Sequence, residues 1–240
     1  MSKVIQEFSR FAYEYDRYNI IQAEVAKSLV AQLPIDPYDT LIDVGCGSGE
    51  VYKNIKQRGL YCTHFIAFDS SPQMLEVHPD AHNIEKISGD FNHAEAFHFI
   101  APSKKNLLLS SSALQWSKDL NLTLKSLSLI APHAYFAIFT ANTFHTLHHI
   151  AGVTSPIYPE ATLKEMLSAY YDATFELKTY RLKFQTVRDM FLYIKKSGVS
   201  GGEKQLSYGQ MKNLMENYPL DYLEFEVLFT RGDSLHFEES

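Results

Sequence analysis

A glycine-rich loop that follows a short hydrophobic segment constrains this chain more than any other feature. Residues 41–44 form an apolar run interrupted by Asp43, and Gly45, Gly47 and Gly49 follow it at alternate positions. Glycine lets the backbone turn sharply and approach a ligand closely. In open α/β sheets, ligands bind beyond the carboxyl ends of the strands. The pattern therefore predicts a buried strand, a ligand-binding turn and a helix.

The rest of the chain alternates between strand and helix patterns. We expect strands at residues 40–44, 63–68, 84–88, 105–110, 135–139, 175–184 and 222–230, the last of them at the sheet edge. We expect helices at residues 4–33, 48–58, 119–130, 187–196 and 207–217, with another starting at Ser71 and Pro72. Such alternation predicts a Rossmann-like α/β fold with a seven-stranded, mostly parallel sheet, an antiparallel edge strand and helices on both faces.

The residue after the loop argues against a nucleotide carrying a pyrophosphate. The dinucleotide fingerprint has a third glycine at the sixth position, where this chain has Glu50. A carboxylate at the start of the helix would repel a pyrophosphate, which binds to free backbone N–H groups. The loop therefore favours a ligand without phosphate and disfavours a nicotinamide-dependent oxidoreductase.

Three carboxylates follow three successive expected strands and match the parts of S-adenosyl-L-methionine. Asp43 can reach the ammonium group, and Asp69 can accept hydrogen bonds from both ribose hydroxyls. Asp90 can accept from the adenine amine, while Phe91 and Met74 hold the ring by apolar contact. Any one of the aspartates alone is as well explained as a turn residue or helix cap. Their combination with the glycine loop predicts a cofactor site.

Bulk properties exclude several classes of protein. The 240 residues carry a formal net charge of −6, which argues against a general nucleic-acid binder. No apolar run is long enough to cross a bilayer, and the N-terminus lacks the apolar core of a signal peptide. Cys46 and Cys62 have no metal-binding or redox spacing, so we expect reduced thiols, a cytoplasmic location and no membrane partner.

The motifs around the cofactor site resemble those of class I methyltransferases. Residues 43–49 resemble the first motif of the family, residues 68–75 the second-strand motif and residues 89–90 the third. The resemblance implies S-adenosyl-L-methionine as cofactor and S-adenosyl-L-homocysteine as product. The expected cofactor-binding residues are Tyr15, Gln22, Asp43, Gly45, Cys46, Gly47, Gly49, Asp69, Ser70, Met74, Asp90, Phe91 and Ser110.

Other segments resemble a more specific group, the malonyl-acyl-carrier-protein O-methyltransferases of biotin synthesis. These segments are residues 8–12, Tyr15, Gln22, and residues 33–34, 110–116, 206–208 and 218–222. The resemblance implies transfer of a methyl group to the free carboxylate of malonyl-acyl carrier protein, which is then a partner of this chain. It also implies one domain over residues 1–240: a helical lid (1–33), a cofactor-binding half (40–140), a helical insertion (141–172) and C-terminal strands and helices (173–240).

A carboxylate acceptor needs no general base, because its ordinary pKa near ~4 leaves it ionised at neutral pH. We therefore expect no catalytic acid or base. Tyr15, Gln115 and Trp116 are candidates for lining the transfer site, although Trp116 is nearly as well explained as core filling. Tyr15 and Gln22 could instead lie on an ordinary packed helix face.

The acceptor carboxylate suggests a cationic partner, for which Arg181 is the candidate. An acidic carrier protein would dock on a basic patch, and the later half of the chain is rich in cations, although any one of them is better explained as part of a solvated face. These cations are Arg181, Lys183, Arg188, Lys195, Lys196 and Lys204.

A cluster of histidines and three other functions stay open at this point. His145 and His149 lie four residues apart beside His148, a spacing that can share a metal, but a surface helix explains them better and we expect no metal. The chain could methylate another small carboxylic acid or metabolite. It could also bind S-adenosylmethionine without catalysis, although the three intact aspartates argue against that. An oxidoreductase is the least favoured.

Overall fold

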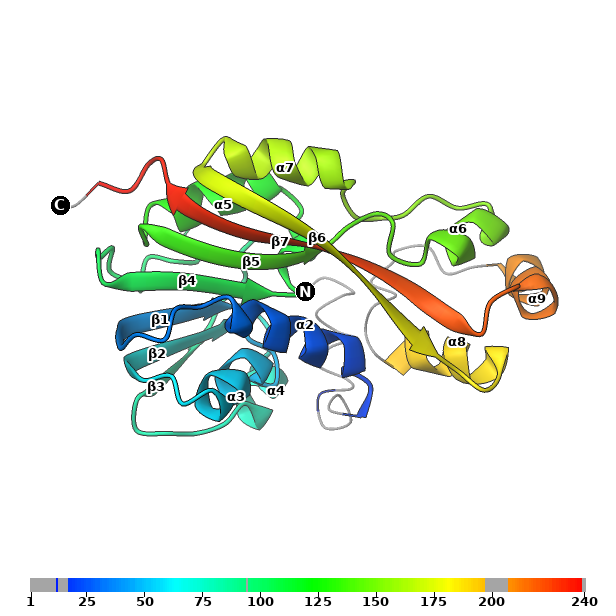
Figure 1. The fold of residues 1–240 in the computed structure, drawn as a ribbon, viewed down its shortest axis with the longest axis horizontal. Coiled ribbons are helices and arrows are strands. Elements are labelled where there is room, and N and C mark those ends of the chain that lie inside the picture. The colour runs from blue at the N-terminus through cyan, green and yellow to red at the C-terminus, as the bar shows by residue number, and fades with distance from the viewer. Residues whose placement is uncertain (1–11, 13–16, 94, 197–206, 239–240) are drawn as a thin grey trace.

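The computed structural model describes residue 12 and residues 17–93, 95–196 and 207–238, and it has one seven-stranded sheet across them (Figure 1). The strand order is β3-β2-β1-β4-β5-β7-β6. The strands are β1 (Tyr38–Val44), β2 (Cys62–Asp69), β3 (Ile84–Ser88), β4 (Asn106–Ser111), β5 (His133–Phe139), β6 (Tyr171–Lys183) and β7 (Tyr222–Ser234). Strands β1 to β5 pair in parallel, so the expected fold class is confirmed.

The strand order reverses at β1, and this reversal positions the site. Strand β1 pairs with β2 on one side and with β4 on the other. Chain connections leave in opposite directions from such a point, which leaves a crevice at the carboxyl ends of the two strands. Asp43 stands near the end of β1, opposite Ala67 of β2 and Leu109 of β4.

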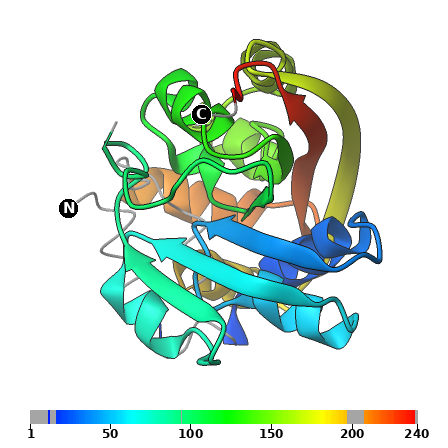
Figure 2. The ribbon, with the colours of Figure 1, turned by 90° about the vertical axis from the view of Figure 1, so that its left-hand side faces the viewer.

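Helices cover both faces of the sheet, because neighbouring strand residues point to opposite sides. The helices are α2 (Ile20–Ala31), α3 (Glu50–Gln57), α4 (Pro72–Val77), α5 (Leu120–Ser128), α6 (His145–Ala151), α7 (Glu160–Ser168), α8 (Val187–Lys196) and α9 (Tyr208–Asn217), with a 3₁₀ turn, η2 (Leu114–Trp116). Leu41 packs with Leu29 of α2 on one face, and its neighbour Ile42 packs with Leu124 of α5 on the other. Figure 2 shows the sheet between these helical layers.

Strand β7 was expected at the sheet edge, and that position is wrong. It lies between β5 and β6 and is antiparallel to both, so β6 forms the edge. Val227, Leu228 and Phe229 are all buried, as suits a strand covered on both faces. Both strands continue past the end of β5 toward α8 and α9 (Figure 1).

The expected helix over residues 4–33 is described as α2, which starts at Ile20; much of the earlier part lies outside the described residues. The expected insertion contains α6 and α7. None of the described helices has the length and apolar character needed to cross a bilayer. Both cysteines are free thiols.

Candidate functional site

A pocket lies where the carboxyl ends of β1, β2 and β4 meet. Its lining consists of residues 22, 26, 43, 45–48, 50, 51, 69–71, 74, 90–92, 111–113 and 116. The fold thus brings together most of the residues that the sequence predicted around the cofactor. Of the other predicted residues, Gly49 and Ser110 lie outside this lining, and Tyr15 lies outside the described residues.

The loop after β1 needs glycine for its backbone and for its contacts. Gly45, Gly47 and Gly49 have φ angles of 75°, 51° and 86°, in the left-handed region that other residues rarely adopt. A Cβ on Gly45 would stand 2.2 Å from the Cβ of Ala113, so the loop rests directly on the chain that leaves β4. The N–H of Gly45 donates to the carbonyl of Phe68 at 2.8 Å, which ties the loop to β2.

Asp69, the last residue of β2, holds the glycine loop and the start of α4. Its Oδ2 accepts from the N–H of Gly47 at 2.9 Å, and its Oδ1 accepts from the N–H of Ser71 at 2.8 Å. Burial raises the pKa of this carboxyl, and the backbone hydrogen bonds oppose that rise. Each carboxylate oxygen can accept a second hydrogen bond, so the pair of oxygens can still receive two hydroxyls from a ligand.

Asp43 is a buried carboxylate with no hydrogen-bond partner in the part of the chain that the structure describes. Its side chain is 0% exposed, and neither oxygen has a hydrogen-bond partner among the described residues. Burial and then the charge of Asp69 raise the pKa of Asp43 well above its ordinary value of 3.8. A buried, unpaired charge is costly unless something pairs with it. Because Asp43 lines the pocket, a bound cation would supply that partner.

The segment after β3 forms the third wall. Oδ1 of Asp90 accepts from the N–H and from the Nδ2 of Asn92, at 3.0 and 2.7 Å. This turn places Asp90, Phe91 and Asn92 together in the lining. The other oxygen of Asp90 lies 3.9 Å from Nε2 of His93, which is too far for a hydrogen bond. Asp90 thus serves partly as a turn residue and still faces the pocket.

Helix α2 contributes Gln22 and Ala26 to the lining of the pocket. Gln22 is 8% exposed, and its Oε1 has no partner among the described residues. The helix also packs on α3 through apolar residues such as Val25 and Ile55. The predicted role of α2 as a cover of the site is therefore compatible with its position.

The segment from the end of β4 contributes one predicted side chain, Trp116, to the lining and two, Ser111 and Ser112, that were not predicted. Oγ of Ser110 donates to the carbonyl of Val44 at 2.7 Å, so this hydroxyl joins two strands below the pocket. Gln115 is buried outside the lining, and its Nε2 donates to the carbonyl of Ser112 at 2.7 Å. Ser112 lines the pocket, as do Trp116, which is half-buried, and Ser111.

The proposed carboxylate partner, Arg181, lies elsewhere. It sits on β6 with its guanidinium 5.0 Å from the ring centre of Tyr222, and it lines a second pocket with His145 and Glu224. The sequence could not have placed it, because the pairing of β6 with β7 decides its position.

Across the described residues, no group of three or more His, Cys, Asp or Glu side chains is arranged to hold a metal. His148 of the histidine cluster is half-buried, and burial lowers its pKa.

Sequence reasoning missed Asn92, Ser111 and Ser112 in the lining. Asn92 stands two residues after Asp90, a spacing that is typical of a turn capped by an aspartate, and that signal was available. The two serines carry no local signal, because serine is common in loops of every kind.

The residues of the pocket fit S-adenosylmethionine. The unpartnered carboxylate of Asp43 suits the ammonium group, and the fixed oxygens of Asp69 suit two ribose hydroxyls. Phe91 and Met74 supply apolar surface for a ring. Glu50 is paired with Nζ of Lys53 at 2.8 Å at the start of α3, where a pyrophosphate would otherwise need open N–H groups.

Comparison with known proteins agrees with this assignment. Residues 42–138 match the family model described as a methyltransferase domain. The chain is 26% identical over 216 residues to the malonyl-[acyl-carrier protein] O-methyltransferase of Bacteroides thetaiotaomicron, covering 86% of this chain and 82% of that protein. It is 29% identical over 237 residues to the protein of the same name from Acetivibrio thermocellus, covering 85% and 80%.

A solved structure shares the fold. A chain of the complex between the Haloferax volcanii Trm112 methyltransferase activator and a methyltransferase superposes with a TM-score of 0.62 at 16% identity, covering 94% of this chain and 97% of that chain. At that identity the likeness concerns the fold alone. The strand order and these likenesses show the class I methyltransferase fold, and the match of residues 42–138 supports an S-adenosylmethionine-dependent methyltransferase.

Proposed function

We propose that this chain methylates the free carboxylate of malonyl-acyl carrier protein, as a step of biotin synthesis. The observation that carries the proposal is the similarity of more than four fifths of the chain to relatives with that name, in Bacteroides thetaiotaomicron and in Acetivibrio thermocellus. The chemistry of the pocket supports it: no Lys, Arg or His side chain lies among the described residues of the lining. A carboxylate acceptor is already ionised and requires no such base.

The reaction needs alignment more than proton transfer. The cofactor supplies an electrophilic methyl group: one acceptor oxygen bonds to the methyl carbon, the carbon–sulfur bond breaks with its electron pair passing to sulfur, and a methyl ester and S-adenosylhomocysteine result. No proton is moved. The chain's own residues hold the reactants in line and exclude water, which accounts for much of the rate in such displacements.

Asp69 should contribute strongly to cofactor affinity in this proposal. Replacing Asp69 with alanine removes one or two charged hydrogen bonds to the ribose, and it also releases the N–H groups of Gly47 and Ser71. Each charged hydrogen bond contributes on the order of 1.5–3 kcal/mol, so we expect at least a tenfold loss of affinity for S-adenosylhomocysteine. Isothermal titration calorimetry with S-adenosylhomocysteine measures this loss of affinity.

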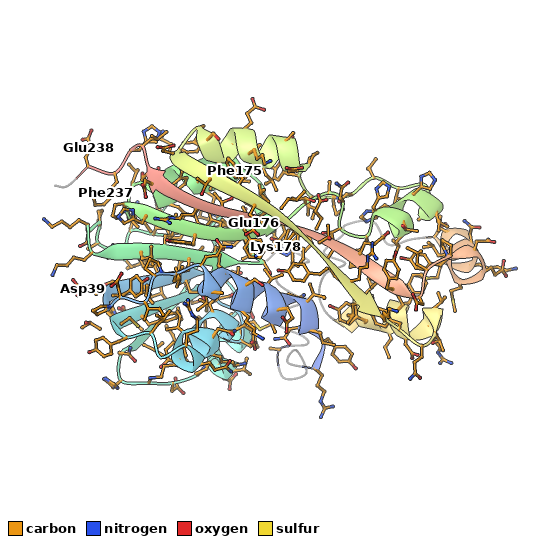
Figure 3. All side chains as sticks on the ribbon, in the orientation of Figure 1. Asp39, Phe175, Glu176, Lys178, Phe237 and Glu238 are labelled. Atoms are coloured by element: carbon orange, nitrogen blue, oxygen red, sulfur yellow. The ribbon has the colours of Figure 1, made fainter. Side chains whose placement is uncertain are left out.

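Asp39→Ala is the matched control. Asp39 lies near the start of β1, at the end away from the glycine loop (Figure 3), and pairs with Lys105 at 3.1 Å on the surface. Its removal should leave the affinity unchanged. If Asp69→Ala binds the cofactor as well as Asp39→Ala, Asp69 does not bind the ribose.

The acceptor is tested directly with labelled cofactor. The protein is mixed with S-adenosylmethionine carrying a labelled methyl group and with malonyl-acyl carrier protein, malonyl-coenzyme A, free malonate or acetyl-acyl carrier protein. We expect label on malonyl-acyl carrier protein and none on acetyl-acyl carrier protein, which is matched except for the missing carboxylate. Rescue of a biotin-requiring strain that lacks the corresponding enzyme is a second measurement.

Label found only on small acids would replace this proposal with the alternative function, methylation of another small carboxylic acid. The cofactor site would serve both reactions equally.

A further inference from the structure

Two serines at the end of β4 have buried hydroxyls with no hydrogen-bond partner within the described ranges. Ser111 ends the strand, Ser112 follows it, and both line the pocket. Neither Oγ has a hydrogen-bond partner among the described residues, although both oxygens are shielded from solvent. Buried polar groups in folded proteins nearly always have a partner, so such exceptions need an explanation, and a ligand is one.

The backbone of Ser112 is held in a conformation that serine rarely adopts. Its φ is 59°, in the left-handed region, which costs roughly 1–3 kcal/mol in a residue other than glycine. Hydrogen bonds hold it from both sides: its N–H donates to the carbonyl of Ala137 at 2.8 Å, and its carbonyl accepts from Nε2 of Gln115 at 2.7 Å. Strain that is held in place in this way is concentrated at ligand sites.

The charges of the pocket decide what these hydroxyls can bind. Asp43, Asp69 and Asp90 line it with Glu50, and no described residue of the lining carries a cationic side chain. The side-chain donors that the described lining offers to an anion are therefore neutral groups, and hydroxyls are among them. A guanidinium in their place would pair with the aspartates and would compete with the positively charged cofactor.

A neutral donor also suits the reaction. An acceptor carboxylate held by a full cation is stabilised in its ground state and becomes a weaker nucleophile, whereas a hydroxyl positions one oxygen and leaves its charge in place. Ser111 and Ser112 line the pocket with Trp116 and Ala113, and Ala113 stands next to Gly45 of the glycine loop.

We infer that Ser111 and Ser112 form the carboxylate-binding subsite of this enzyme and donate hydrogen bonds to the acceptor, in place of the arginine or lysine expected for such a substrate. The inference rests on the proposed function, because it takes the acceptor to be a carboxylate. The two serines are positioning and specificity residues.

The test compares Ser111→Ala, Ser112→Ala and the double variant with wild type. We expect KM for the malonyl acceptor to rise tenfold or more in each single variant and further in the double variant, because a hydrogen bond to a charged group is lost. Affinity for S-adenosylhomocysteine should change less than threefold. Ser112→Asn, which tolerates the left-handed backbone and keeps a donor, should retain KM near the wild-type value.

Ser126→Ala is the matched control, since Oγ of Ser126 donates to the carbonyl of Leu122 on an exposed turn of α5. It should leave both KM and cofactor affinity unchanged, and thermal melting reports whether each variant is folded. If wild type labels malonyl-acyl carrier protein and the serine variants keep its KM, the subsite alone is overturned. An equal loss of cofactor affinity shows instead that the serines bind the cofactor. If wild type labels no carboxylate at all, the proposed function fails and the subsite with it.

Discussion

Replacing Asp43 with asparagine should remove most of the affinity for S-adenosylmethionine and make the cofactor-free protein more stable. The carboxylate is fully buried and has no partner among the described residues, so ionising it opposes folding until a cation arrives. The amide keeps the shape and loses the charge. We expect at least a tenfold loss of affinity for S-adenosylhomocysteine, and a gain of about 1–3 kcal/mol in the free energy of unfolding at neutral pH.

The pH dependence has a definite sign. Burial raises the pKa of Asp43 in the folded protein above its ordinary value of 3.8, so the folded state binds this proton more tightly than the unfolded state does. The stability gained from that proton is fully present below about pH 4 and is lost as the pH rises through the folded pKa. The stability gap between Asp43→Asn and wild type should therefore be small in acid and grow toward neutral pH.

Urea unfolding at several pH values measures this gap, and calorimetry measures affinity. Asp39→Asn is the control, because a surface aspartate should change stability by no more than about 0.5 kcal/mol. An Asp43→Asn protein that is less stable than wild type at neutral pH would mean that the carboxylate has a stabilising partner inside the protein.

Replacing Gly45 with alanine should cost about 3 kcal/mol or more of stability and abolish cofactor binding. The new Cβ would stand 2.2 Å from the Cβ of Ala113, so either the glycine loop or the segment after β4 must move. Overpacking in a well-packed region costs roughly 1–3 kcal/mol, and the left-handed backbone at φ 75° adds about 1–2 kcal/mol. Either movement displaces a wall of the pocket.

Gly59→Ala separates the two costs. Gly59 has a similar φ of 67°, but a Cβ there would meet nothing within 4 Å. The Gly59→Ala variant should lose only the stability that the left-handed backbone costs, about 1–2 kcal/mol, and it should keep its cofactor affinity. Adding Ala113→Gly to Gly45→Ala removes the clashing atom and should restore part of the stability and the binding, a coupling that a double-mutant cycle measures. Equal losses of stability in Gly45→Ala and Gly59→Ala would show that the segments around Gly45 move apart at no cost and remove the clash.

Local patterns predicted the part of the site that is built from consecutive residues. The glycine loop, the strand before it and the start of α4 at Ser71 and Pro72 each follow from a few neighbouring residues, and all appear in the structure. The positions of Asp43 and Asp69 at strand ends also follow, because parallel strands bring their carboxyl ends to one edge of the sheet.

What escaped prediction depends on contacts between distant segments. Arg181 was assigned to the acceptor on chemical grounds, but its place is set by pairing with Glu224 across β6 and β7. The same non-local pairing puts β7 inside the sheet. The backbone conformation of Ser112 depends partly on a hydrogen bond to the carbonyl of Ala137 in β5, a contact that the residues around the serine do not reveal.

The inner position of β7 affects how this protein can be made. β7 follows the other six strands of this sheet in the sequence, yet β6 joins the sheet only through it, so β6 has no strand to pair with until β7 has been added. During synthesis, the exposed edge of β5 is open to pairing with the wrong chain, a known hazard for unpaired strands. The half of the sheet around β1 can assemble early, and closure of the other half waits until β7 has been synthesised.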